Sequence, residues 1–522
     1  MFKSIYTFSP FGYEGAVVQV ETDLRKGIPC VDIVGMADGT VKETRERVLA
    51  AVRNSGLEFP MERVLIALSP CDLRKEGGGF DLPIAFSVLN AGEITRNPDT
   101  KAEDVIGVIG ELELSGKVRA VKGIHAFIST ALASGIDRFV IPKANESEVK
   151  AFANASYIAV ESLEQVMDII RGNGNFIRGN EKPVENDSEN EIEVDGVFFQ
   201  KQVMEEPYDI ALDGQNGRQV KALALAISGH HNLMQWGAPG NGKTMYTQKM
   251  MNYAPRLTVN EMQSVSRIWS LAGLMKPSEP LKKYPPIRIP HQTASIEGIC
   301  GGGPTCRPGE ISLAHNGILF FDETAEFRSS ILQMLRVPLE NKSITLSRAG
   351  RCTTYPADFI FIGASALCPC GNYGSKDRIC LCSIKSIELF HKKISAPLMD
   401  RCLSIHTDCK GKTTYTKEQI LEMIASATKI QREKGKYNND LSPQEVNELY
   451  DGLDEKSKSI VDRYIDAPRK RNLLIKAALT NANLYGRENI NFEDVKEIAD
   501  NLMFNPIADV ENCSMQTEEE TA

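Results

Sequence analysis

The chain has 522 residues, of which 42% are hydrophobic and 25% are charged, and its formal net charge is −9. These values predict a soluble globular protein of several domains without general attraction to nucleic acid or acidic membranes, although they allow a local basic channel. No stretch approaches the roughly 18 apolar residues of a membrane-spanning helix, and the start MFKSIYTFSPFGYEG lacks a signal-peptide pattern. Together with twelve cysteines that form no small-domain framework, these features predict a reducing, cytoplasmic location.

Residues 1–170 alternate between segments with the periodicity of strands and of helices. Strands are predicted at 15–24, 30–36, 63–70 and 137–142, and helices at 41–56 and 80–91. This alternation predicts an α/β domain at the N-terminal end.

Two changes in composition predict the remaining domain boundaries. Residues 171–196 are rich in Gly, Asn and Glu and poor in large apolar residues, which favours a linker over a surface loop within one domain. Near 407–416, strand-like runs give way to helical periodicity. We therefore expect a second α/β domain at 197–410, a helical domain at 411–510 and a disordered acidic tail at 511–522.

The strongest motif is GAPGNGKT, which follows the apolar run NLMQW and precedes the helix-like segment MYTQKMMNYA. It matches the G-x-x-x-x-G-K-[ST] phosphate loop in the context that this motif requires, which favours it over a chance glycine turn. Small residues let backbone N–H groups converge on phosphate oxygens, while Lys243 reaches the β- and γ-phosphates and Thr244 ligates Mg²⁺. The sequence predicts that ATP and Mg²⁺ are bound by Gly237, Ala238, Pro239, Gly240, Asn241, Gly242, Lys243 and Thr244.

A second element, GILFFDE at residues 317–323, supplies the groups that hydrolysis needs. Its apolar run is typical of a buried parallel strand and ends in two carboxylates. Asp322 suits the Mg²⁺ shell, and Glu323 is the candidate for polarising the attacking water. Carboxylates after an apolar run are common, so the assignment depends on the phosphate loop that precedes them.

The segment LCPCGNYGSKDRICLC, residues 367–382, holds two C-x-C pairs: Cys368 with Cys370, and Cys380 with Cys382. Two glycines between the pairs allow the second to fold back onto the first. Four thiolates at about 2.3 Å satisfy a tetrahedral, structural Zn²⁺. Because the spacing departs from the commoner C-x-x-C knuckle, a metal-free loop of reduced cysteines and a redox pair stay open as alternatives.

Three long segments carry a family resemblance: GQNGRQVKALALAISGHHNLMQWGAPGNGKT, HQTASIEGICGGGPTCRPGEISLAHNGILFFDETAEF and ISAPLMDR. In these, the chain resembles the magnesium-chelatase-like AAA+ ATPases, and within them the YifB/ComM group. The resemblance covers nearly the whole chain. It implies a Lon-protease-like (S5-type) α/β domain at the N-terminal end, a central P-loop AAA+ domain with a parallel sheet in an αβα sandwich, and a C-terminal helical lid. It also implies a homo-oligomeric ring, commonly a hexamer, with nucleotide between subunits.

The same resemblance implies roles for further residues. Arg401 in PLMDR matches the arginine that reaches the neighbouring subunit's nucleotide, although a surface salt bridge is the alternative. Arg469 falls where the lid places its sensor arginine, with Arg471 close enough to confuse the alignment. The chain departs from the pattern at Ala366, which takes the place of a γ-phosphate-sensing asparagine. Slow hydrolysis, or substitution by Ser365, is expected from this change.

A Lon-like N-terminal domain raises a protease hypothesis, and the residues argue against it. Gly77, Gly78 and Gly79 stand where the protease-like turn carries its serine, and His125 stands where the lysine base is expected. A Ser–Lys mechanism needs both groups within hydrogen-bond reach. We therefore expect an interaction or assembly domain.

Two arginine-bearing segments make DNA the favoured partner. ICGGGPTCRPG, 299–309, is expected to be a flexible loop with Arg307, and SITLSRAGRCTTYPA, 343–357, a hairpin with Arg348 and Arg351 near its turn. Such arginines can contact phosphates in a ring channel without reading sequence, although ion pairs between subunits would use them equally well. The favoured function is an ATP-driven motor that remodels or branch-migrates DNA, as the resemblance implies. A regulatory or scaffold ATPase and a metal-insertion subunit for porphyrin remain alternatives.

Overall fold

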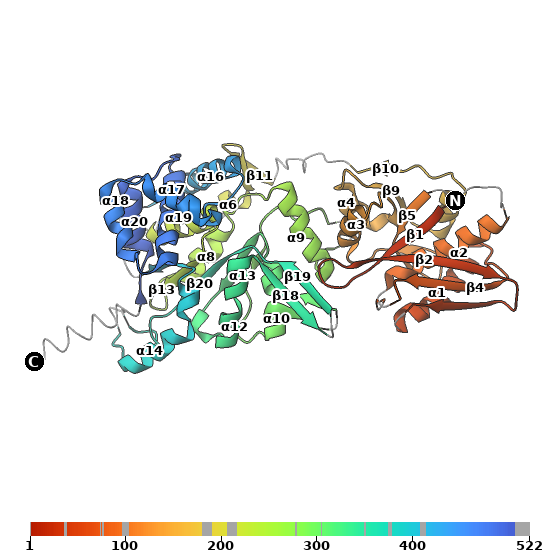
Figure 1. Ribbon diagram of the computed structural model, residues 1–522, viewed down its shortest axis with the longest axis horizontal. Coiled ribbons are helices and arrows are strands. Elements are labelled where there is room, and N and C mark those ends of the chain that lie inside the picture. Colours follow the sequence, from red (N-terminus) through yellow and green to blue (C-terminus); the bar gives the residue numbers. More distant parts are fainter. Residues whose placement is uncertain are drawn as a thin grey trace, which may run out of the picture.

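The computed structural model describes residues 2–35, 39–71, 73, 75, 78–96, 104–179, 190–205, 217–276, 279–303, 305–348, 351–373, 378–407 and 414–506. The molecule is elongated, with an N-terminal α/β domain at one end and the C-terminal helices packed beside a central α/β domain at the other (Figure 1). Among these residues, no helix is both long and apolar enough to cross a membrane.

The N-terminal domain is built on an eight-stranded mixed sheet with the order β10-β9-β8-β5-β1-β2-β4-β3. The strands are β1 (Phe2–Ser9), β2 (Ala16–Arg25), β3 (Cys30–Val34), β4 (Arg63–Ser69), β5 (Asp104–Val108), β8 (Arg138–Pro142), β9 (Ser156–Val160) and β10 (Ile177–Arg178). A small hairpin joins β6 (Glu111–Leu112) to β7 (Val118–Arg119), and the helices are α1 (Gly39–Asn54), α2 (Asp81–Arg96), α3 (Ile124–Ala133), α4 (Glu146–Lys150) and α5 (Leu163–Ile170). All six elements predicted for this domain are present.

Alternation explains why these strands form a sheet. In β4 every second residue is buried, so Val64, Ile66 and Leu68 face the core while their neighbours are more exposed. Helix α2 is buried along most of its length and fills the same core.

The range 171–196, predicted to be a linker, contains ordered elements at both ends. Strand β10 pairs with β9 of the N-terminal sheet, and β11 (Glu191–Val194) pairs with β12 (Val197–Gln200). Glu191 is buried and forms ion pairs with Arg256 and Lys283 of the central domain. The two ends of the range therefore belong to the domains that they adjoin, while 180–189 lie outside the described residues.

The central domain contains a five-stranded, all-parallel sheet with the order β14-β17-β20-β13-β21. Its strands are β14 (Ile287–Arg288), β17 (Gly317–Phe321), β20 (Phe359–Ser365), β13 (Leu233–Trp236) and β21 (Leu403–His406). Every residue of β13, β17 and β20 is buried, as expected for strands covered on both faces. The parallel sheet agrees with the predicted P-loop architecture.

Helices and short hairpins complete this domain. The helices are α6 (Gln202–Glu205), α7 (Gly217–Gly229), α8 (Lys243–Met251), α9 (Val259–Ala272), α10 (Ile296–Cys300), α11 (Glu310–Leu313), α12 (Ser329–Met334), α13 (Arg336–Asn341), α14 (Ile384–Lys393) and α15 (Ala396–Met399). The hairpins are β15 (Gly301–Gly302) with β16 (Arg307–Pro308), and β18 (Ser343–Arg348) with β19 (Arg351–Pro356). The hairpin predicted at 343–357 is confirmed, and the loop predicted at 299–309 contains a short hairpin.

The C-terminal helices are α16 (Lys417–Lys434), α17 (Pro443–Asp451), α18 (Glu455–Val461), α19 (Pro468–Leu484) and α20 (Phe492–Leu502). Thr416 and Ser442 cap α16 and α17, each in a reciprocal pair with the Gln or Glu three residues later. The apolar faces of α16 and α19 join one core with α7 and strands of the central sheet. The predicted tail, 511–522, lies outside the described residues.

The N-terminal and central domains meet at a turn between β1 and β2. From α9, Arg267 donates to the carbonyl of Tyr13 at 3.0 Å and to Thr130 Oγ1 at 3.1 Å, and its guanidinium lies 4.3 Å from the centre of the Tyr13 ring. From β19, Thr353 accepts from Tyr13 N at 2.9 Å and donates to Glu14 at 2.8 Å. Specific polar contacts therefore fix the turn against α9 and the β18–β19 hairpin.

Candidate functional site

The phosphate loop lies where β13 ends and α8 begins. Gly240 and Gly242 have φ angles of +92° and +72°, a region that residues with a Cβ rarely adopt. Lys243 Nζ donates to the carbonyls of Gly237 and Ala238 at 2.7 and 2.9 Å, so its ammonium lies over the loop. No side chain caps the first turn of α8, and the N-terminus of a helix is a favourable place for an anion.

The two predicted Mg²⁺ ligands lie together although they are far apart in sequence. Thr244 Oγ1 is 3.0 and 2.9 Å from the two carboxylate oxygens of Asp322. Strand β17 brings Asp322 to this place beside the phosphate loop. Glu323 follows in the left-handed region, with φ 50°, and its side chain is exposed. A non-glycine residue in this conformation is uncommon and is often found at functional positions.

A buried polar chain beneath the loop was not predicted. Gln219 of α7 donates to Gln235 of β13 at 2.7 Å, and Gln235 donates to Thr247 of α8 at 2.7 Å. All three side chains are almost fully buried, so each bond would be costly to break. The chain ties the strand before the loop to the helix after it. A polar residue within the apolar run NLMQW was the only signal in the sequence.

The two candidate arginines, Arg401 and Arg469, share one carboxylate. Arg401 forms an ion pair with Glu340 of α13 and donates to the Pro397 carbonyl at 2.5 Å, and Arg469 of α19 reaches the same carboxylate at 3.5 Å. The hydrogen bond from Arg401 holds the pKa of Glu340 below its usual value. Sequence reasoning missed Glu340, which connects the two residues.

The position predicted to sense the γ-phosphate lies at the end of β20, next to the phosphate loop. Gly237 N donates to the Ser365 carbonyl at 3.2 Å, so Ala366 follows directly beyond that contact. Ser365, the proposed substitute, is buried, and its hydroxyl donates to the Ala366 carbonyl at 3.1 Å. That hydroxyl is therefore engaged with the backbone.

The four cysteines of the C-x-C pairs form one cluster. Their sulfur atoms all lie within 4.8 Å of one another, a grouping that could hold a metal ion. Cys368 is buried, Cys370 is exposed, and Cys380 and Cys382 are intermediate.

The N-terminal glycine turn carries no catalytic pair among its described residues. His125 is fully buried, neither ring nitrogen has a hydrogen-bond partner, and burial lowers its pKa to about 3. Asp81, which follows the turn, is bound by Thr44 at 2.7 Å and Arg47 at 2.9 Å. Gly78 and Gly79 supply no nucleophile, and Gly77 lies outside the described residues.

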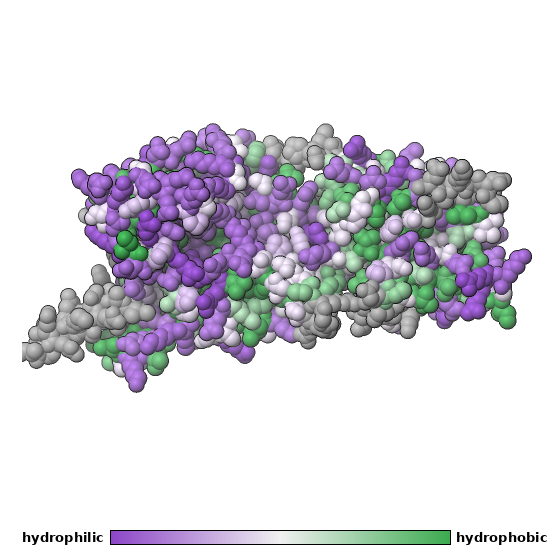
Figure 2. Space-filling model, viewed as in Figure 1, coloured by the Kyte–Doolittle hydropathy of each residue, from purple (hydrophilic) through white to green (hydrophobic). Residues whose placement is uncertain are grey.

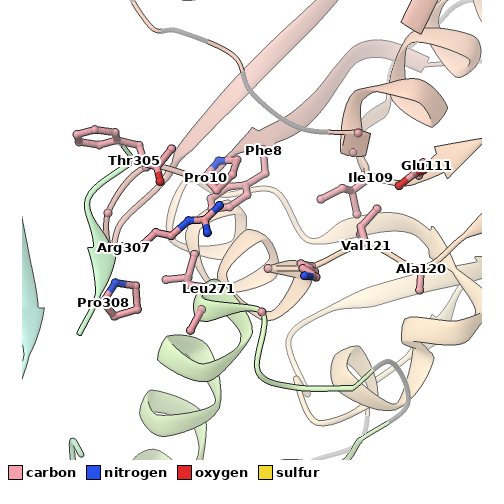
Figure 3. Close-up of a pocket in the computed structure, with 18 of the residues that line it drawn as sticks. Phe8, Pro10, Ile109, Glu111, Ala120, Val121, Leu271, Thr305, Arg307 and Pro308 are labelled. Carbon is pink, nitrogen blue, oxygen red and sulfur yellow. The ribbon is translucent and has the colours of Figure 1, made fainter. Parts of the chain in front are cut away.

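A cavity of about 490 Å³ separates this turn from the central domain (Figure 3). It is lined by residues of both domains, including Gly78, Gly79, Lys122, Leu271, Arg307 and Tyr355. Arg307 extends from β16 into the cavity. The loop that was expected to face a channel therefore faces the N-terminal domain, and no residue of the phosphate loop lines the cavity.

Two family comparisons match this architecture. Residues 210–416 match the family described as "Magnesium chelatase, subunit ChlI". Residues 20–145 match the family described as "Subunit ChlI of Mg-chelatase".

Individual relatives extend the similarity over most of the chain. Over 399 residues it is 34% identical to the uncharacterized protein YifB of Escherichia coli, covering 76% of this chain and 74% of that protein. Over 502 residues it is 32% identical to the competence protein ComM of Haemophilus influenzae, covering 93% of this chain and 94% of that protein. A shorter match, 22% identical over 163 residues, covers 30% of this chain and 21% of the Lon protease of Clostridium acetobutylicum.

Proposed function

Because the chain belongs to the YifB/ComM family of magnesium-chelatase-like AAA+ proteins, we propose that it hydrolyses ATP and uses the energy to remodel DNA. ATP turnover rests on the geometry of the phosphate loop. Action on DNA rests on the name of one relative and on the arginine-bearing hairpin.

The observation that carries the ATPase proposal is the contact between Thr244 and Asp322. Their oxygens lie 2.9 to 3.0 Å apart. Adjacent ligands of an octahedral Mg²⁺ with bonds of 2.0–2.1 Å are separated by about 2.9 Å. The two side chains therefore fit neighbouring positions around the ion. Bound with ATP, Mg²⁺ would supply positive charge at the β- and γ-phosphates.

The other residues of the loop fit the anion itself. Lys243 would exchange its two carbonyl contacts for phosphate oxygens, and backbone N–H groups at the start of α8, where no side chain caps the helix, would donate to them. Glu323 is exposed beside Asp322 and would orient a water molecule for attack. We assign substrate binding to the loop and water activation to Glu323.

A ring of subunits, in the form of a hexamer, is part of the proposal. The guanidinium of Arg401 contacts Glu340 within its own subunit, and it would exchange this contact for the nucleotide of a neighbour when a ring forms. Apolar side chains are exposed in the segment before α14, with Ile379 at 83% and Leu381 at 90%, and Figure 2 shows small hydrophobic patches among hydrophilic surface near this helix. Such side chains are better explained by a second copy of the chain than by solvent.

Two findings support DNA as the substrate: the similarity to the relative named competence protein ComM, and the β18–β19 hairpin. The hairpin places Arg348 and Arg351 on either side of its turn. Arginines at the tip of a hairpin suit contacts to the phosphate backbone, which are independent of sequence.

The test is ATP turnover by the full chain alone and with single-stranded DNA, duplex DNA, a four-way junction or a porphyrin. We expect the junction to raise the rate several-fold, and a variant with both Arg348→Ala and Arg351→Ala to lose that increase while keeping the rate without DNA. Equal rates with and without DNA would contradict the DNA proposal and favour a regulatory or scaffold ATPase. Stimulation by porphyrin alone would favour metal insertion, the function that the matched family descriptions name.

A further inference from the structure

We propose that Cys368, Cys370, Cys380 and Cys382 bind one structural Zn²⁺ that braces the phosphate loop. The metal site is inferred from the positions of the sulfur atoms alone. The proposal that the metal stabilises the phosphate loop depends, in addition, on the proposed ATP site.

The sulfur positions match a tetrahedral thiolate site. Cys368 and Cys370 Sγ are 3.4 Å apart, and each lies 3.6 Å from Cys380 Sγ. Four sulfurs at 2.3 Å from a tetrahedral Zn²⁺ are separated by about 3.8 Å. A disulfide needs about 2.05 Å, and all four residues are free cysteines. The spacing is too long for a disulfide and close to that of a tetrahedral zinc site.

The backbone around the first pair is shaped to hold a metal. Gly371 turns the chain with φ +75°, and its N–H donates to the Cys368 carbonyl at 3.0 Å. The N–H of Tyr373 donates to Cys368 Sγ at 3.3 Å. N–H groups directed at sulfur favour the thiolate form and orient it, as outer partners do in metal sites. Residues 374–377 lie outside the described residues.

The cluster also contacts the nucleotide site. A Cβ added at Gly371 would lie 2.9 Å from Cγ of Pro239, so the turn rests directly on the phosphate loop. Leu367 is buried in the core that also contains Trp236, the last residue of β13. On the other side, Cys368 packs against Ile387 of α14, the helix that leads toward Arg401.

Zinc would therefore tie together three segments: the end of β20, the turn beside the phosphate loop, and the start of α14. Four thiolates fill the coordination shell of the ion and leave no position for water or a substrate, so its role is structural. Binding displaces thiol protons, and the metal stabilises the fold in which the four sulfurs are together.

The first experiment measures zinc and iron in the full chain purified without chelator. We expect about one zinc per chain, lost in a variant with Cys368→Ser and Cys380→Ser and retained in Cys352→Ser, whose exposed cysteine lies outside the cluster. If the double variant does not fold, native mass spectrometry of the parent chain still reports the bound ion. Protein without metal, or a double variant that keeps it, would overturn the zinc site. Iron in place of zinc would also overturn the assignment.

The second experiment tests the bracing role. Removing zinc from the folded chain with a strong chelator should raise the ATP concentration for half-maximal turnover several-fold, and adding zinc back should restore it. If zinc is present but its removal leaves ATP binding unchanged, the metal site stands and the bracing role fails. If ATP turnover is absent with zinc bound, the failure lies in the proposed function instead.

Discussion

The central and N-terminal domains of this chain are both α/β, yet among the described residues only the central domain brings together the side chains that we assign to ATP hydrolysis. In the central domain, Lys243, Thr244, Asp322 and Glu323 meet at the carboxyl ends of β13 and β17. In the N-terminal domain, the described part of the corresponding turn offers Gly78 and Gly79, and His125, which stands where a lysine base was expected, is buried without a partner.

The difference shows how far fold and chemistry can separate. The fold of a domain depends on apolar periodicity, which both domains retain, whereas a reaction depends on a few polar side chains at fixed positions. We infer that the N-terminal domain serves contact with the central domain. The contacts of Arg267 and Thr353 with the β1–β2 turn support this role.

The largest expected effect comes from Lys243→Ala. Removing the cation that contacts the phosphates should lower ATP turnover by about 100- to 1000-fold and weaken nucleotide binding. The matched control is Gln248→Ala, an exposed position on the same helix, which should leave both unchanged. If Lys243→Ala hydrolysed ATP at the parent rate, the assignment of the nucleotide site to the central domain would be wrong.

Arg401→Ala should lower turnover by about 1000-fold while sparing ATP binding, because an arginine that completes a neighbour's site acts on charge developing during hydrolysis. Mixing this variant with Lys243→Ala subunits should restore part of the activity, since some interfaces then pair an intact loop with an intact arginine. Arg463→Ala, exposed on the helical domain, is the control. Ring-forming mixtures without rescue would contradict an arginine acting between subunits.

A smaller effect, on stability, is expected at the domain contact. Burial raises the pKa of Glu148 to about 7, while a hydrogen bond with Ser270 of the central domain acts in the opposite direction. Between pH 4.5 and 7 the unfolded chain loses this proton and the folded chain keeps it, so about 3 kcal/mol of stability is lost as the pH rises. The melting temperature of Glu148→Gln should therefore be higher than that of the parent chain at pH 8 and equal to it at pH 5.

Buried histidines act in the opposite direction. Burial lowers the pKa of His125 and His231 to about 3. Their contribution to the free energy of unfolding is therefore lost as the pH falls below about 6.5. Because these histidines are present in both proteins, their effect cancels in the difference in melting temperature between Glu148→Gln and the parent chain, which should be measured at each pH. The exposed Glu164→Gln is the control. A constant difference from pH 5 to 8 would contradict the raised pKa.

The smallest expected effect is that of Gly79→Ser. A Cβ at this position would lie 3.4 Å from Ile109 Cγ1, an ordinary contact, so we expect a stability change within about 0.5 kcal/mol. ATP turnover should be unchanged, and cleavage of unfolded casein should be absent because His125, which stands where the lysine base was expected, is fully buried. Casein cleavage by this variant would show that the N-terminal domain lacks only its nucleophile.

Short sequence patterns correctly predicted secondary structure and the phosphate loop, because these features depend on residues that are close together in the sequence. The strands and helices of the N-terminal domain, the parallel strand before Asp322 and the hairpin at 343–357 all follow from periodicity over a few residues. The phosphate loop was predictable because its function requires glycines at fixed spacing, and Gly240 and Gly242 do have positive φ angles.

Contacts between distant segments could not be predicted in this way. Nothing near Arg401 in the sequence indicates that Glu340 binds it, because α13 and the residues that follow α15 come together only in the folded domain. The direction of Arg307 depends on the N-terminal domain, which packs against its hairpin through Gly12 and Thr305. The linker was predicted too broadly because composition does not reveal that Glu191 finds buried partners.

The most direct test of the central claim compares phosphate release and bound ATP in the parent chain and in Glu323→Gln. The amide keeps the size of the side chain and cannot polarise water, so we predict full ATP binding with hydrolysis lowered by about 100-fold or more. Glu326→Gln, an exposed carboxylate three residues away, should behave like the parent. Hydrolysis by Glu323→Gln at the parent rate would contradict the assignment of ATP chemistry to this site.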